Sequence, residues 1–482
     1  MTQTATRRES DSMGPVDVPA DRYWGAQTER ARHRFAIGTE RFPLEIVHAL
    51  ARIKAAAARV NADLGVLPAD LATPIAAAAQ EVVDGRLDGE FPLSVWISGS
   101  GTQANMNVNE VIANRAIEMM GGVLGSKEPV HPNDHVNRSQ SSNDVVPSAV
   151  ALAAALLIER AVRPAAVALR DALADKAETW HGHVKIGRTH LMDAVPMTLG
   201  QEFAGYAGLI DANLARLDFA RDGLLPLAIG GTAVGTGLNA PAGFAEAVAA
   251  DLARQTGLDV TRAANPFAAM GSHDALVMAS GALRTLAVSL HKIANDIRLL
   301  ACGPRAGFAE LLLPENEPGS SIMPGKVNPT QCEALAMLTV QVMGLDTAVA
   351  MGGAGGHLEM NVYKPLIGHN VVTAARLLSD GMTSFTASAV RDMEVNTGQL
   401  ETTVGRSLML VTALAPEIGY DMAARVAHRA HHTGTSLREA ALALEAIDAA
   451  TFDRIVDPGA MTGDLPPRTA YRGAEGDAER DG

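Results

Sequence analysis

Apolar residues recur at helical rather than alternating spacing along most of the chain. In one early segment they share a single helical face: Ile46, Leu50, Ile53, Ala57 and Val60. Five later stretches predict long helices, over residues 146–180, 198–224, 268–300, 330–351 and 362–390. Each is far longer than an average helix of about 11–12 residues, and apolar residues cover more than one of its sides. Because such helices need neighbours on several sides, we predict a homo-oligomer with a helical core.

The regions on either side of these long helices have a different pattern. Shorter helices and Gly-rich turns occupy the first part, and two short helices, over 420–432 and 436–444, lie near the end. We therefore predict a mainly α protein with three domains and a tail. These are an N-terminal lobe over 1–138, a central helical domain over 139–394, a small C-terminal helical domain over 395–464 and a disordered tail over 465–482.

Composition and charge narrow the class of protein. Of 482 residues, 47% are hydrophobic and only 4% are aromatic, which favours helices over strands. The net charge of −14 argues against a nucleic-acid or acidic-membrane partner. Cys302 and Cys332 form no CxxC pair, so we expect free thiols in a reducing cytoplasm. No run approaches the length of a membrane span, and we expect no membrane association.

Four polar segments interrupt the helical pattern at or just before predicted helix starts. They are SGSGTQANMNVNE (98–110), HPNDHVNRSQSSND (131–144), GRTHLMDAVPMTLGQE (187–202) and GSSIMPGKVNPTQCE (319–333). Helix starts present unpaired N–H groups and partial positive charge, which suits anions. Capping accounts for some of these residues: Thr198 and Gln201 match a capping box, and Asn328 can cap a helix beginning at Pro329. Four segments with surplus Ser, Thr, Asn and His are harder to explain by capping alone.

Competing motifs do not fit these segments. Within 319–326, five residues rather than four separate the glycines, and Val327 stands where a phosphate loop needs Ser or Thr. GGTAVGTG over 230–237 follows no βαβ pattern and is interpreted as a tight Gly turn. His131, Asp134 and His135 lack the cysteines or HExxH helix of a zinc site, so we expect no metal.

The loop GSSIMPGKVNP (319–329) resembles the signature loop of the fumarase/aspartase superfamily. The similarity extends from about Met13 to Gly463 and includes the other polar segments and GGTAVGTGLN, in the family's order. Within the superfamily the chain is most similar to class II fumarases, because His190 stands where aspartases typically have glutamine. The run HLEMNVYKP (357–365) is also fumarase-like, since aspartases usually have Glu in place of Lys364.

The resemblance implies a fold, an assembly and an activity. Family members have a long central five-helix bundle between two smaller lobes, and four copies pack into a twenty-helix core whose active sites are each shared between three chains. The implied activity is the reversible hydration of fumarate to L-malate, a tricarboxylic acid cycle reaction, by acid–base catalysis without a cofactor. Aspartate ammonia-lyase, disfavoured by His190, and a non-catalytic helical scaffold remain as alternatives.

The resemblance also implies the roles of individual residues. Ser320 is the base, and the candidates for activating it are Lys326, the loop amides and the helix starting at Pro329. Lys326 and Asn328 match the positions that bind the carboxylate on which charge develops. His190 is the acid/base for the departing water, with Glu333 orienting its ring. Further residues match the family's substrate contacts: Ser100, Thr102, Ser141, Ser142, Asn143, Thr189 and Ser321. A second, non-catalytic dicarboxylate site matches His131, Pro132, Asn133 and Asp134.

Overall fold

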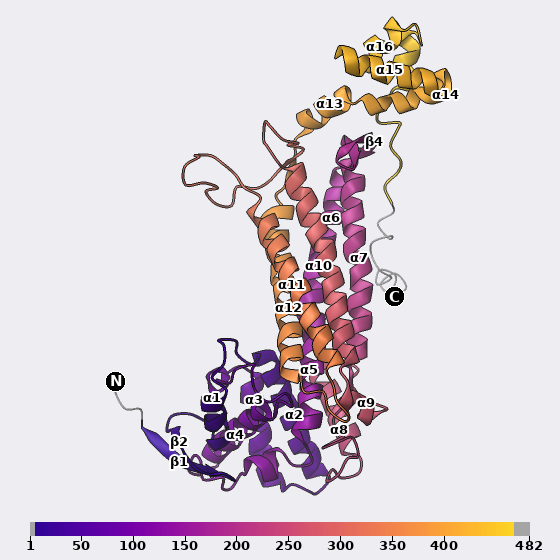
Figure 1. The fold of residues 1–482 in the computed structure, drawn as a ribbon. Coiled ribbons are helices and arrows are strands. Elements are labelled where there is room, and N and C mark those ends of the chain that lie inside the picture. Colours follow the sequence, from indigo (N-terminus) through magenta and orange to yellow (C-terminus); the bar gives the residue numbers. More distant parts are fainter. Residues whose placement is uncertain (1–4, 467–482) are drawn as a thin grey trace, which may run out of the picture. The chain divides into compact units, whose positions relative to one another are not determined.

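The computed structural model describes residues 5–466, and most of them are helical (Figure 1). Strands in this part of the chain form four two-stranded pairs, so the predicted mainly α fold class is confirmed. The chain folds as two compact units, each assembled from three segments. The first unit comprises Met1–Pro164, Arg216–Ala287 and Val340–Ser379, and the second comprises Ala165–Ala215, Val288–Thr339 and Asp380–Gly482. The three-domain division stays a prediction, and its tail lies outside the described residues from 467 onward.

Long helices lie where the apolar spacing predicted them, and Figure 1 shows them as the longest coiled ribbons. They are α5 (Ser142–Leu157), α6 (Arg163–Thr179), α7 (Leu199–Leu224), α10 (Asp274–Leu300), α11 (Thr330–Ala354) and α12 (Lys364–Phe385). A π-helical turn (Ile158–Val162) joins α5 to α6, and a second one (Thr386–Val390) follows α12.

One predicted long helix is broken. The stretch over 268–300 divides at Ser272 and His273 into α9 (Pro266–Gly271) and α10. Asn265 starts α9, because its side-chain oxygen accepts the N–H of Ala268 at 3.0 Å. The break itself falls at Ser272, whose backbone is extended, with φ of −133° and ψ of 164°. Apolar residues continue at nearly the same helical spacing from α9 into α10, so the spacing alone predicted one continuous helix.

The remaining elements of the first unit are short strands and helices, of which α2 is the longest. They are β1 (Thr6–Asp11), β2 (Gly14–Pro19), α1 (Ala26–Arg34), α2 (Leu44–Asp63), α3 (Ala69–Val83), α4 (Thr102–Met119), β5 (Pro226–Leu227), α8 (Phe244–Thr256) and β6 (Thr261–Arg262). The predicted apolar face of α2 is confirmed as core, since Ile46, Leu50 and Ile53 are fully buried. This helix packs against α3, α5 and α8.

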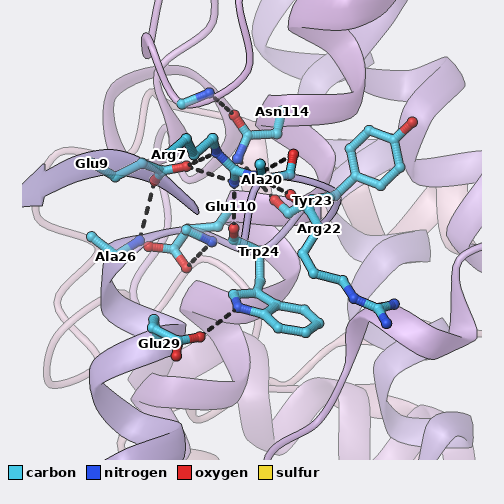
Figure 2. A network of polar contacts seen from close by, with 12 residues as sticks. Arg7, Glu9, Ala20, Arg22, Tyr23, Trp24, Ala26, Glu29, Glu110 and Asn114 are labelled. Atoms are coloured by element: carbon cyan, nitrogen blue, oxygen red, sulfur yellow. Dashed lines mark hydrogen bonds and ion pairs between the residues drawn. The ribbon is translucent and has the colours of Figure 1, made fainter. Parts of the chain in front are cut away.

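Buried carboxylates attach α1 and the N-terminal hairpin to α4 (Figure 2). Glu110 of α4 accepts the N–H groups of Gly25 at 2.9 Å and Gln27 at 2.8 Å, at the start of α1. Glu9 of β1 accepts the N–H of Ala26 at 3.2 Å. Burial raises the pKa of the Glu110 carboxyl, against the hydrogen bonds that lower it. The network holds the start of α1 against α4 and the N-terminal hairpin.

The second unit carries a small helical core of its own. Its shorter elements are β3 (Val184–Thr189), β4 (Met192–Thr198), β7 (Leu311–Leu312), β8 (Glu394–Val395), α13 (Thr397–Arg406), a 3-10 helix (Leu408–Leu414), α14 (Ala415–Ile418), α15 (Tyr420–Thr433), α16 (Leu437–Ala443) and α17 (Ala449–Ile455). Leu414, Val426 and Ala441 lie fully buried among these C-terminal helices. The two short helices predicted near the end of the chain are confirmed as α15 and α16.

Two helical stretches in the described residues are long and apolar enough to cross a membrane by length and composition alone. They are Ser142–Thr179, with a mean hydropathy of 1.8, and Thr330–Ala354, with 1.6. The expectation that no run approaches this length is therefore wrong. The apolar window of the first is 67% buried, as in a core helix, whereas that of the second is only 33% buried. Helix α11 thus presents apolar side chains that the rest of the described chain, residues 5–466, does not cover.

Candidate active site

Two of the polar segments meet in the first unit through a chain of hydroxyl groups. Ser98 Oγ lies 2.9 Å from Ser100 Oγ, and Ser100 Oγ lies 2.8 Å from Thr102 Oγ1. Thr102 Oγ1 in turn lies 2.8 Å from Ser142 Oγ. Thr102 begins α4 and Ser142 begins α5, so two helix starts meet at these hydroxyls. The arrangement suits an anion, as the sequence indicated, and it adds Ser98 to the predicted contacts.

A capping box that was not predicted from the sequence forms the start of α5. Ser141 Oγ accepts the N–H of Asn143 at 3.2 Å, and Asp144 Oδ1 accepts the N–H of Ser141 at 2.9 Å. The helix therefore begins at Ser142, four residues before the predicted start, with Pro147 inside it. Asn143 donates one amide hydrogen to the carbonyl of Ala233 at 2.9 Å. Its second amide hydrogen remains for a ligand.

Gly99 brings the fumarase-like run 357–365 against the hydroxyl chain. A Cβ atom on Gly99 would lie 1.6 Å from the Val362 carbonyl oxygen, so no other residue fits without moving the backbone. In the same run, buried Lys364 donates from Nζ to the carbonyl of Asn361 at 2.7 Å. Burial lowers the pKa of Lys364 to about 8. Lys364, the second residue on which the resemblance to fumarases rests after His190, is thus buried.

Thr189 and His190 lie in the second unit, at the tip of the β3–β4 hairpin. Thr189 pairs with Met192, which leaves His190 and Leu191 as a two-residue turn with φ of +56° and +60°. Turns with positive φ at both central positions usually contain Asn-Gly or Asp-Gly, so a His-Leu turn is strained. The segment that contains His190 was predicted to lie at a helix start, which is wrong for His190. Only its end, the confirmed capping box of Thr198 and Gln201, starts a helix.

A buried ion cluster supports this hairpin. Glu310, fully buried, lies 2.6 Å from Arg188 Nη2 and 3.1 Å from Lys185 Nζ. Lys185 also donates to Glu202 at 2.7 Å. Removing one partner from a buried ion cluster leaves an unpaired charge, which costs about 3–5 kcal/mol. Because Arg188 directly precedes Thr189, the cluster fixes the strand that carries the predicted acid/base.

The signature loop supplies hydrogen-bond donors to Ser320. Its Oγ accepts the backbone N–H of Ile322 at 3.3 Å and of Met323 at 3.1 Å. Amide donors aimed at an oxygen stabilise negative charge there, which is what a deprotonated serine requires.

The ends of the signature loop are closed on each other. Asn328 Nδ2 donates to the carbonyl of Gly319, and a Cβ on Gly319 would lie 2.0 Å from the Lys326 carbonyl oxygen. Helix α11 begins at Thr330, as the stretch 330–351 predicted and one residue after the start at Pro329 that capping by Asn328 implied. The Asn328 side chain therefore closes the loop and does not cap the helix.

Other predicted residues are exposed and have no side-chain hydrogen bond or ion pair within residues 5–466. They are Thr189, His190, Ser321, Lys326 and Glu333. The pair predicted between Glu333 and His190 is therefore not formed within one chain. It stays a prediction, as do the individual roles of these residues.

The residues of the predicted second site form one turn. His131 precedes a π-helical turn (Pro132–Val136), and its Nδ1 accepts the N–H groups of Asn133 at 3.2 Å and Asp134 at 3.1 Å. An accepting Nδ1 leaves the ring proton on Nε2. Asn133 and Asp134 are exposed, so the side chains needed for a ligand are accessible. The described residues contain no group of three or more His, Cys, Asp or Glu arranged to hold a metal ion.

Comparisons with known proteins identify the family of this chain. Residues 14–344 match the model of the lyase family, and residues 410–463 match that of the fumarase C C-terminus. The class II fumarate hydratase of Thermosynechococcus vestitus is 59% identical over 461 residues, which are 96% of this chain and 99% of that protein. That of Ralstonia nicotianae is 58% identical over 458 residues, 95% of this chain and 99% of its own.

Solved structures give the same result. The class II fumarase of Schistosoma mansoni has a TM-score of 0.93 at 43% identity, covering 95% of this chain and 99% of its own. A fumarate lyase:delta crystallin from Brucella melitensis, bound to cobalt, has a TM-score of 0.91 at 41% identity, with the same coverage of 95% and 99%. The predicted resemblance is therefore confirmed: the chain belongs to the class II fumarate hydratase family.

Proposed function

We propose that this protein catalyses the reversible hydration of fumarate to L-malate. The observation that carries the proposal is its similarity to class II fumarate hydratases, at up to 59% identity over 96% of the chain. His190 distinguishes this activity from aspartate ammonia-lyase, and the donors around Ser320 Oγ fit an acid–base enzyme better than a scaffold.

The chemistry requires a base for a weak carbon acid and stabilisation of charge on a substrate that is already a dianion. In the dehydration direction, Ser320 removes the proton from the carbon next to a carboxylate, and its two amide donors stabilise the alkoxide. Lys326 and Asn328 then hold the carboxylate on which the second negative charge develops. His190, oriented by Glu333, protonates the departing hydroxide. Protein side chains alone supply these steps.

The remaining predicted contacts hold the substrate. The hydroxyl chain that ends at Ser142, together with Asn143, offers donors at two helix starts to a carboxylate. Thr189 and Ser321 are the other residues that we propose as substrate contacts. We keep His131 to Asp134 as a second dicarboxylate site without a catalytic role. The two free cysteines support a cytoplasmic location.

An absorbance assay tests the reaction. Adding L-malate to the purified protein should produce the ultraviolet absorbance of fumarate, and adding L-aspartate should not. A signal with aspartate alone would replace the hydratase by an ammonia-lyase. No change in absorbance with either substrate would favour the non-catalytic scaffold.

We also propose a homotetramer with active sites shared between three chains. Helix α11 exposes Met337 by 69%, Val340 by 57% and Met351 by 73%, although it is strongly apolar. Exposed apolar stripes of this kind indicate a protein interface. The exposure of His190, Lys326 and Glu333 in one chain supports completion of the site by other copies.

Light scattering tests the assembly. We expect a particle of four times the chain mass of 50.3 kDa. Met337→Glu should dissociate it, because a buried unpaired carboxylate is costly at an apolar interface. A monomeric wild-type protein with full activity would contradict both the tetramer and the shared sites.

A further inference from the structure

Asp144 joins two parts of the first unit that are far apart in the sequence. Its Oδ1 accepts the N–H of Ser141 at 2.9 Å, at the start of α5. Its Oδ2 accepts the N–H groups of Gly230 at 2.9 Å and Thr232 at 3.0 Å. The side chain is fully buried. The GGTAVGTG run was interpreted from the sequence as a simple turn. The carboxylate of Asp144 binds it to the start of α5, where the proposed substrate contacts Ser142 and Asn143 lie.

Only a carboxylate satisfies these neighbours. Both oxygens of Asp144 face N–H donors, so an asparagine would place its own NH₂ group against at least one of them. Burial raises the pKa of Asp144 to about 6, against the hydrogen bonds and the attraction of Lys54, which lower it. Buried Lys54 donates to Asn137 Oδ1 and Gln140 Oε1, both at 2.9 Å. Burial lowers the pKa of the Lys54 amine to about 7, and this side chain lies behind the segment that leads to Ser141.

The bound loop is held against its local preference. Thr232 has φ of +54°, which is costly for a β-branched residue, at about 1–3 kcal/mol. A Cβ on Gly230 would lie 2.4 Å from the Cβ of Ala245, so this end of the loop lies directly on α8. The other end accepts the amide of Asn143 through the Ala233 carbonyl at 2.9 Å. Strain maintained by specific contacts is typical of functional segments.

We propose that Asp144 is a positioning residue of the dicarboxylate site: it holds the loop 230–233 as a platform that fixes Ser142 and Asn143 for substrate. The inference rests on the proposed function, since it assigns a cause to the geometry of that substrate site. Asp144 itself does not contact substrate. Its carboxylate sets the position of the Ala233 carbonyl, which orients the Asn143 amide, and it sets the helix start that presents Ser142.

Steady-state kinetics of Asp144→Asn test the inference. Misplacing a hydrogen bond to a charged ligand should raise KM for L-malate about tenfold, while kcat falls much less, because Ser320 and His190 are untouched. Glu110→Gln is the matched control, since Glu110 is also a buried carboxylate that accepts helix-start amides. It should lower the melting temperature and leave KM within about twofold of the wild-type value. If Asp144→Asn also changes only the melting temperature, Asp144 is a structural residue and the inference is wrong.

Hydrogen exchange of the unmodified protein provides a test that does not depend on folding of the variant. An equilibrated fumarate and L-malate mixture should slow amide exchange at Gly230 and Thr232 by about threefold or more, since ligand at Asn143 rigidifies the attached loop. The amides of Gly25 and Gln27, bound by Glu110, should not change. Unchanged exchange at Gly230 and Thr232 in a protein that turns over malate would overturn the inference but leave the proposed function intact. Absence of turnover in the wild type would instead remove the proposed function, and the inference with it.

Discussion

Replacing Ser320 with alanine is expected to lower kcat for malate dehydration by about 10²–10⁴-fold, the usual contribution of a positioned base. The reason is local. Ser320 Oγ accepts two backbone amides, which stabilise its alkoxide form, and alanine removes that oxygen without disturbing the loop closure at Gly319. Proton exchange at the carbon of L-malate in D₂O, followed by NMR, measures the step directly. It should be lost with the oxygen.

Ser384→Ala is the control for this substitution. It removes an exposed hydroxyl that donates to Gln331 at 2.9 Å, outside the predicted site. Its kcat should stay close to the wild-type value, and both variants should keep the mass of the wild-type particle. Near-normal carbon–proton exchange in Ser320→Ala would assign the base role to another residue.

His190→Gln should also lower kcat by about 10²–10⁴-fold, because glutamine matches the hydrogen bonding of the imidazole but cannot deliver a proton. The two substitutions impair different steps of the reaction. Ser320 removes the proton from carbon, whereas His190 assists the departure of hydroxide. In His190→Gln, carbon–proton exchange of L-malate should therefore rise relative to fumarate formation. The ratio of the two rates, measured by NMR and ultraviolet absorbance, distinguishes the roles.

An unchanged ratio in His190→Gln would contradict this assignment. The variant also separates the role of the side chain from that of the turn. Glutamine adopts a φ of +56° less readily than histidine, but Thr189 and Met192 still pair on either side of the turn, so the hairpin should keep its register. Circular dichroism and particle mass should therefore match the wild type, and loss of either would indicate a misfolded hairpin.

Much of the helical fold was predictable, because helix formation depends on near neighbours in the sequence. The face of α2 with Ile46, Leu50 and Ile53 is the buried face, as spacing predicted. The capping box of Thr198 and Gln201 forms because both partners lie within four residues of each other. The break at Ser272 and His273 was missed because a short helix can stop without losing the apolar phase of the next one.

Candidate residues for the site could be named from the sequence, but their geometry could not be predicted. Its hydroxyls stood out as surplus polar residues before helices, and their family pattern named Ser320 and His190. No short-range signal marked the β3–β4 hairpin, because its turn is His-Leu where Asn-Gly or Asp-Gly would be expected. The ion cluster of Glu310 with Lys185 and Arg188 joins residues more than a hundred positions apart, beyond any local pattern.

By itself the sequence determined the fold class, the family and the residues available for proton transfer, because these depend on spacing and on motifs that each lie within one short segment. Only the tertiary structure decided which of these residues meet. It joined the hydroxyls of Ser100, Thr102 and Ser142 into one chain, and it placed His190 on a strained turn. It also bound the Gly-rich loop 230–233 to the start of α5 through the carboxylate of Asp144. The physical reason is that hydrogen bonds and ion pairs between distant segments depend on how helices and loops pack, which no local spacing records.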